Sequence, residues 1–100
     1  LCGTTDNIAL RNGELIIKDW KTNKQFRKDS PYTLNYPFDY IPNTEFWIYA
    51  IQLNLYRALL DLDVKHLEIV WFRDGGWEVH TMPIMNREIR IIFEDLKATQ

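Results

Sequence analysis

The chain is 100 residues long, 46% apolar and 14% aromatic, with a net charge of −2, which suits one small domain with a packed core. This composition excludes a disordered chain, which needs low hydrophobicity and high net charge. No apolar run reaches the ~18 residues of a membrane span, so no membrane partner is expected. A single cysteine, Cys2, excludes an internal disulfide framework and an all-cysteine metal or iron–sulfur site within these residues.

The ends of the sequence suggest the setting of the protein. No signal peptide opens the chain, and one cysteine suits a reducing compartment, so we expect a cytoplasmic (intracellular) protein. The chain starts at Leu1 rather than at a methionine, and its first residues already resemble a strand. We therefore expect residues 1–100 to form a single core domain that is a fragment of a longer chain.

The first third of the sequence predicts a hairpin and a long loop. A strand is predicted from Gly3 to Leu10, and Asn12-Gly13 favours a type I′ turn, which needs positive φ at both central residues. Glu14 to Lys21 is predicted as the second strand, because Leu15, Ile16 and Ile17 have high β-propensity. Residues 22–43 contain three prolines and three tyrosines and predict an irregular loop, and a loop of this length is usually functional or mobile.

The rest of the chain predicts a helix, a second hairpin and a second helix. Asn43 or Thr44 is the expected N-cap of the first helix, and Pro83 ends the last strand. The predicted ranges are a helix to about Leu62, strands Val64–Arg73 and Trp77–Met82 around Asp74-Gly75-Gly76, and a helix from Asn86 with Ile89, Ile92, Phe93 and Leu96 at helical spacing. The order β-β-α-β-β-α predicts an α/β (α+β) fold with a mixed central sheet flanked by helices.

An acid and an amine end the second predicted strand. Asp19 and Lys21 are two residues apart, so they lie on one face of a strand. If Asn12 and Gly13 form the hairpin loop, Asp6 lies directly opposite Asp19, and opposed like charges are destabilising. A shared proton or a divalent cation would relieve this repulsion. Oxygen ligands of this kind suit Mg²⁺ or Mn²⁺, while the alternative is a surface Asp19–Lys21 ion pair with an unrelated Asp6.

Positive charge is concentrated directly after this strand end. Residues 18–28 contain five basic residues and one acidic residue, a local charge of +4, whereas the other residues sum to −6. Such a patch can bind phosphate, although a solvated loop is the simpler interpretation. The neighbouring Tyr32, Tyr36 and Tyr40 are suited to stack on unpaired bases, or to cover the sheet.

Three short motifs together resemble a known family. Gly3-Thr4-Thr5-Asp6, then Asp19-Trp20-Lys21-Thr22, then Gln52-Leu53-Asn54-Leu55-Tyr56 resemble the PD-(D/E)xK nuclease superfamily, in particular its RecB-like exonuclease branch. In that branch a Gly-x-x-Asp strand precedes an Asp-Tyr-Lys-Thr/Ser strand, and a helical Gln-x-x-x-Tyr follows. The resemblance runs from Gly3 to about Leu60 and implies a restriction-endonuclease-like core that lacks its first helix.

The resemblance implies a role for each matching residue. Asp6 and Asp19 would bind the catalytic metal, Mg²⁺ or Mn²⁺, together with the main-chain carbonyl of Trp20, and Lys21 would be the catalytic lysine. Spacing places Gln52 and Tyr56 on one face of a helix, where the alternative is a core tyrosine with a glutamine at its edge. The residues expected to bind DNA or support the site are Thr22, Lys24, Arg27, Lys28, Gln52 and Tyr56.

The implied function is a metal-dependent deoxyribonuclease, an exonuclease of recombination, repair or phage type, whose products carry a 5′-phosphate and a 3′-hydroxyl. The branch usually has a further His or Glu ligand on a helix before the Gly-x-x-Asp strand, and these residues do not contain that helix. His66 and His80 come too late in the chain to replace it and are expected on the surface. The alternatives are an inactive nuclease-like module that binds DNA or a protein, and a ribonuclease on the same scaffold. Oligomeric state does not follow from the sequence.

Overall fold

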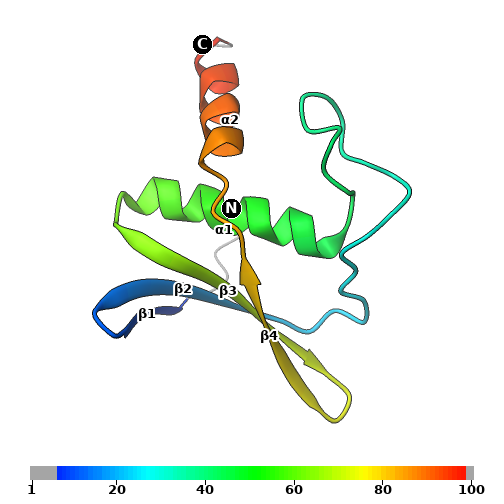
Figure 1. Ribbon diagram of the computed structural model, residues 1–100, viewed down its shortest axis with the longest axis vertical. Helices are drawn as coiled ribbons and strands as arrows, with labels where there is room; N and C mark the ends of the chain where they lie inside the picture. The colour runs from blue at the N-terminus through cyan, green and yellow to red at the C-terminus, as the bar shows by residue number, and fades with distance from the viewer. Residues whose placement is uncertain (1–6, 99–100) are drawn as a thin grey trace.

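Two hairpins and two helices form the α+β fold in the computed structural model of the chain, which describes residues 7–98 (Figure 1). Figure 1 shows α1 crossing the sheet, the long loop leading into one end of α1, and α2 extending away from the strands. The elements are β1 (Asn7–Arg11), β2 (Glu14–Lys21), α1 (Glu45–Leu60), β3 (Val64–Arg73), β4 (Gly76–Met82) and α2 (Asn86–Ala98).

The four strands form one mixed sheet in the order β1-β2-β3-β4. The outer pairs are antiparallel hairpins, and the central pair, β2 and β3, is parallel. Parallel neighbours need a crossover connection, and α1 supplies it between these two strands. Consequently the carboxyl ends of β2 and β3 lie side by side at one edge of the sheet.

The first hairpin forms around the predicted turn. Asn12 and Gly13 both have positive φ, 53° and 80°, as a type I′ turn requires. Ile8 pairs with Ile17, which confirms the predicted register in the part of the hairpin that the structure describes. Asp6, predicted to face Asp19, lies outside the described residues.

The hydrophobic core lies between α1 and the central strands. Each fully buried aliphatic side chain of this kind contributes about 1.5–3 kcal/mol. Asp19 shares the core-facing side of β2 with Ile17, because side chains alternate along a strand. The buried apolar cluster consists of Ile17, Ile41, Phe46, Ala50, Leu53, Val64, Leu67, Ile69, Met82 and Met85.

Both ends of α1 have defined caps. Thr44 is the N-cap, and its hydroxyl oxygen accepts from the backbone N–H of Trp47. The helix ends at Leu60, two residues before the predicted Leu62, because Asp61 adopts a left-handed conformation with φ 53°. The backbone N–H of Asp61 then donates to the carbonyl of Ala58.

Residues 22–43 are irregular, as predicted, and specific contacts tie this loop to both helices. The backbone N–H of Arg27 donates to Glu45 at 2.9 Å, and the Arg27 guanidinium pairs with the same carboxylate at 2.9 Å. These hydrogen bonds lower the pKa of Glu45 to about 2. At the other end of the loop, the Tyr40 hydroxyl donates to Glu88 of α2, which raises the pKa of Tyr40.

A buried asparagine holds the segment between β4 and α2 against α1. The Asn54 side-chain amide donates to the carbonyls of Ala50 and Pro83, and its oxygen accepts from the backbone N–H of Met85 at 2.7 Å. The side chain is fully buried, so the core has no water to replace these bonds. Neither helix that the structure describes is long and apolar enough to cross a membrane.

We expect Asn54→Ala to lower the free energy of unfolding by about 2–4 kcal/mol, because it leaves the buried backbone N–H of Met85 and the partly buried carbonyl of Pro83 without this partner. Urea unfolding monitored by circular dichroism measures this loss. Asn35→Ala, at an exposed loop position, is the matched control and should change stability by less than about 0.5 kcal/mol. Equal effects of the two substitutions would show that the Asn54 bonds do not hold this segment.

The Arg27–Glu45 contact predicts a pH dependence. The pKa of Glu45 falls from 4.5 to about 2, so its stabilising contribution is present above pH 4.5 and is lost as the pH falls towards 2. We expect Glu45→Gln to have a lower Tm than the parent at pH 6, and the difference to shrink between pH 4.5 and 2. Glu94→Gln, at an exposed position on α2, is the control. A difference in Tm that stays constant down to pH 2 would contradict the assignment.

Candidate active site at the end of β2

Asp19 and Lys21 form an ion pair on the core-facing side of β2. Lys21 Nζ lies 3.0 Å from Asp19 Oδ2, and the other carboxylate oxygen accepts from the backbone N–H of Trp20 at 2.9 Å. Asp19 is only 6% exposed. Removing charges from water is costly, so each charge here depends on the other. The two groups are therefore held together at the end of a buried strand, as the sequence predicted.

Tyr49 of α1 completes the immediate surroundings of the lysine. Lys21 Nζ lies 4.5 Å from the centre of the Tyr49 ring, a cation–π contact. The Tyr49 hydroxyl is hydrogen-bonded to the side-chain amide of Asn23. The carbonyl of Asn23 in turn accepts from the indole N–H of Trp71 at 2.7 Å. This chain of contacts links α1, the end of β2 and the end of β3 around the ion pair.

Sequence reasoning did not assign Tyr49 to the site. The available signal was its position one helical turn before Gln52, which places both residues on neighbouring parts of the helix surface. Gln52 is exposed, and Tyr56 is half-buried against the hydrophobic core. The side-chain contacts of Lys21 within residues 7–98 are with Asp19 and Tyr49. The roles of Gln52 and Tyr56 stay predictions.

The side chain of Trp20 points to the opposite side of β2 from the ion pair. It is 45% exposed and stacks on Phe72 of β3, with ring centres 5.5 Å apart and an interplanar angle of 16°. Alternation along the strand explains this placement, because Trp20 lies between Asp19 and Lys21. The end of β2 therefore has a charged side facing α1 and an aromatic side facing away from it.

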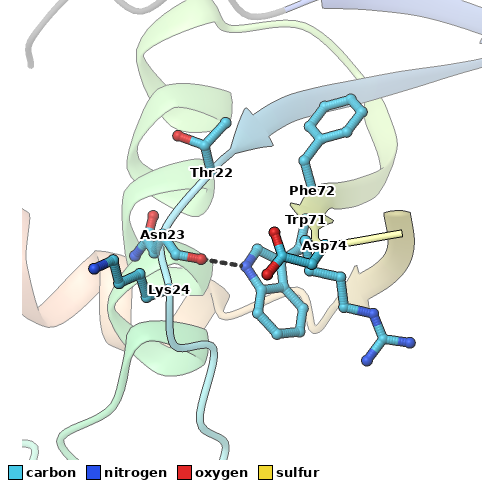
Figure 2. Close-up of a pocket in the computed structure, with 7 residues that line it drawn as sticks. Thr22, Asn23, Lys24, Trp71, Phe72 and Asp74 are labelled. Carbon is cyan, nitrogen blue, oxygen red and sulfur yellow. Dashed lines mark hydrogen bonds between the residues drawn. The ribbon is translucent and has the colours of Figure 1, made fainter. Parts of the chain in front are cut away.

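The basic residues after β2 have different surroundings. Lys24 is exposed and, with Thr22, borders a pocket between the end of β2 and the end of β3 (Figure 2). Lys28 is also exposed, with Nζ 5.1 Å from the centre of the Phe46 ring. The Arg27 guanidinium is already paired with Glu45. Lys24 and Lys28 are thus better placed than Arg27 to meet a phosphate.

The described residues contain only part of the metal ligands that the sequence predicts. Within residues 7–98, no three His, Cys, Asp or Glu side chains come together as a metal-binding group. The Asp19 carboxylate and the main-chain carbonyl of Trp20 are oxygen donors of the type that Mg²⁺ and Mn²⁺ prefer. The second expected carboxylate, Asp6, lies outside the described residues. The donor atoms are therefore of the type that suits these ions, and the described residues provide one of the two expected carboxylates.

The two histidines lie apart from the ion pair. His66 pairs with Glu14, at the start of β2, at 3.0 Å, and its side chain is 40% exposed, in keeping with the predicted surface position. His80 is more covered than predicted, because its side chain is 16% exposed. Its ring stacks on Phe26 of the long loop with centres 4.7 Å apart. Sequence patterns on β4 gave no sign that a distant loop residue would cover this histidine.

Comparison of the chain with family models, curated proteins and solved structures returns no match. The site at the end of β2 is distinguished by a nearly buried acid–amine pair, an aromatic ring over the amine, and a pocket directly beyond the strand end. Ligands of open α/β sheets commonly bind at the carboxyl ends of parallel strands, which is where these features gather.

The Tyr49 ring should shield the Lys21 amine. We expect acetic anhydride to acetylate Lys21 faster in Tyr49→Leu than in the parent protein, because the substitution removes the ring above the ammonium group. Tyr49→Phe keeps the ring and should behave like the parent. Peptide mass spectrometry measures the rate, with the exposed Lys65 as internal control. Equal labelling of Lys21 in all three proteins would contradict this role for Tyr49.

Proposed function

We propose that this chain is the core of a Mg²⁺- or Mn²⁺-dependent DNA nuclease that hydrolyses phosphodiester bonds. The observation that carries the proposal is the nearly buried Asp19–Lys21 pair at the carboxyl end of β2. Burying two charges is costly in free energy. In this chain the buried pair lies at a strand end that is followed directly by a basic segment. An acid and an amine held side by side at such a position are suited to phosphoryl chemistry.

Each residue of the site has its own proposed role in the reaction. Asp19 would hold the metal ion with Asp6 and the main-chain carbonyl of Trp20. When bound, such an ion polarises a phosphoryl oxygen and lowers the pKa of water. Lys21 would orient the attacking water or neutralise the negative charge that develops on the phosphate. Tyr49 would keep the Lys21 ammonium group in place for either task, since its ring lies against that group.

The proposed fold is a restriction-endonuclease-like core without its first helix. Its support is the chain order, in which β2 carries Asp19 and Lys21 between two neighbouring strands and α1, carrying Gln52 and Tyr56, follows. This is the order that the motif resemblance implies. The same resemblance favours an exonuclease of recombination or repair in a cytoplasmic setting.

DNA would be bound chiefly through its backbone. Lys24 and Lys28 are exposed on the segment that leaves β2, within a short distance along the chain of Lys21. Lysines that neutralise phosphates release counterions, so binding should weaken steeply as the salt concentration rises. Contacts of this type carry little sequence information, which suits a nuclease that acts on many sequences.

A second candidate is a nuclease-like module that binds DNA or a protein without cleaving it. The observation in its favour is that residues 7–98 bring only one carboxylate to the site and contain no cluster of three metal-binding side chains. Such a module would still bind through the basic segment and would not cleave DNA. Metal uptake and cleavage separate the two candidates.

We expect Asp19→Asn and Lys21→Met each to reduce Mn²⁺-dependent cleavage of fluorescently labelled DNA by at least about 100-fold. Each substitution leaves one charge of a nearly buried pair without its partner, so the double variant, in which both charges are absent, shows whether the fold is kept. Lys18→Met is the matched control, because Lys18 is on the same strand but pairs with Glu68 on the other side. Circular dichroism confirms folding in each case.

Two results would overturn the nuclease assignment. One is cleavage at the parental rate by folded Asp19→Asn or Lys21→Met, which would place the chemistry elsewhere. The other is a calorimetric titration in which Mn²⁺ does not bind, or binds equally well after Asp6→Asn and Asp19→Asn. The second result, together with retained DNA binding, would instead establish the non-cleaving module.

A further inference from the structure

A pocket of about 610 Å³ lies directly beyond the end of β2, and we name it the strand-end pocket. Figure 2 shows the segment that leaves β2 on one side of it and the end of β3 on the other. Its volume lies within the range of small-molecule sites, about 300–1,000 Å³. Its lining residues are Thr22, Asn23, Lys24, Trp71, Phe72, Arg73 and Asp74.

The pocket exists because two parallel neighbours have unequal lengths. Lys21 pairs with Trp71 as the last partner across β2 and β3, and β3 then continues to Arg73. Beyond Lys21 the chain leaves the sheet and opens the edge of β3. The bond from the Trp71 indole N–H to the carbonyl of Asn23 ties the departing segment to β3, as drawn in Figure 2. The pocket is therefore formed by fixed strands and one defined bond.

One wall of the pocket contains Phe72, whose ring is stacked on Trp20 behind it. Phe72 is 37% exposed, lines the pocket, and stacks on Trp20, which holds its ring in one orientation. Exposed aromatic faces on a rigid support are the surfaces on which unpaired bases stack. Asp74 and Thr22 add a carboxylate and a hydroxyl, groups that hydrogen-bond the edges of a base.

Two basic residues border the pocket, one on the segment after β2 and one at the end of β3. Lys24 is exposed and has no ion pair among the residues that the structure describes. Arg73 pairs with Glu78 at 2.7 Å and lies over the Trp71 ring, so it contributes a fixed charge at the rim. An aromatic wall next to a free ammonium group matches a base joined to its phosphate. A base inside an intact duplex is already stacked and paired, so it cannot enter.

We propose that the strand-end pocket binds one unpaired nucleotide of the DNA, with its base on Phe72 and its phosphate near Lys24. The inference rests on the proposed function, because the pocket begins at Thr22, directly after Lys21, and so lies beyond the strand end that carries the reactive pair. It names the substrate class: DNA with a single-stranded or frayed end, engaged in preference to a closed duplex.

The test measures binding without cleavage. Fluorescence anisotropy follows a labelled oligothymidine of about 12 nucleotides as it binds the full chain in EDTA. We expect Phe72→Ala to raise Kd about tenfold, and Phe72→Leu, which keeps an apolar side chain and loses the flat ring, to raise it nearly as much. Leu10→Ala is the control, because Leu10 is an exposed apolar residue on β1, at the other edge of the sheet and outside the pocket, and it should change Kd by less than about twofold. A duplex of the same length should bind more weakly.

Three results would overturn the assignment of the pocket: no binding of oligothymidine, equal effects of Phe72→Ala and Leu10→Ala, or tighter binding of the duplex than of the single strand. Each is independent of the reaction, because EDTA prevents it. Cleavage that depends on Asp19 and Lys21, combined with any of these results, would support the nuclease function and contradict the nucleotide-binding role of the pocket. Selective loss of binding in Phe72→Ala, in a parent protein that shows no Mn²⁺-dependent cleavage, would support the nucleotide-binding pocket and contradict the nuclease function.

Discussion

The arrangement at the end of β2 depends on one electrostatic constraint, the nearly buried pair of Asp19 and Lys21. A carboxylate that is 6% exposed requires an opposite charge within contact distance, and Lys21 Nζ provides it at 3.0 Å. The amine in turn needs a surface that keeps it against the acid, and the Tyr49 ring is that surface. The first turns of α1 are therefore coupled to the strand end by charge as well as by apolar packing.

Local signals predicted much of the fold, because they act between near neighbours. Asn12-Gly13 alone sets the first turn and the register of its hairpin, which is why Ile8 meets Ile17 as expected. The Asp19–Lys21 contact followed from alternation along one strand. The end of α1 was missed because Asp61 adopts a left-handed cap that a non-glycine residue rarely takes.

Tertiary contacts account for the parts that the sequence did not predict. Tyr49 reaches Lys21 across a separation of 28 positions, and Phe26 covers His80 from a loop with no regular structure. Neither pairing leaves a periodic pattern, because the partners lie on different elements. The pocket likewise results from where β2 ends relative to β3, two strands that are joined by the α1 crossover and not by a local turn.

The alternation of β2 explains how one strand can serve two kinds of contact. Asp19 and Lys21 face α1, and Trp20 between them faces the other way, where it supports Phe72 at the pocket wall. A slip of one residue in the register would exchange these sides, exposing the charges and burying the indole. Ile16 and Ile17 are both buried, so the contacts of Lys21 with Asp19 and with Tyr49 of α1 are what oppose such a slip. These contacts thus fix which side of the strand carries charge and which carries the aromatic surface.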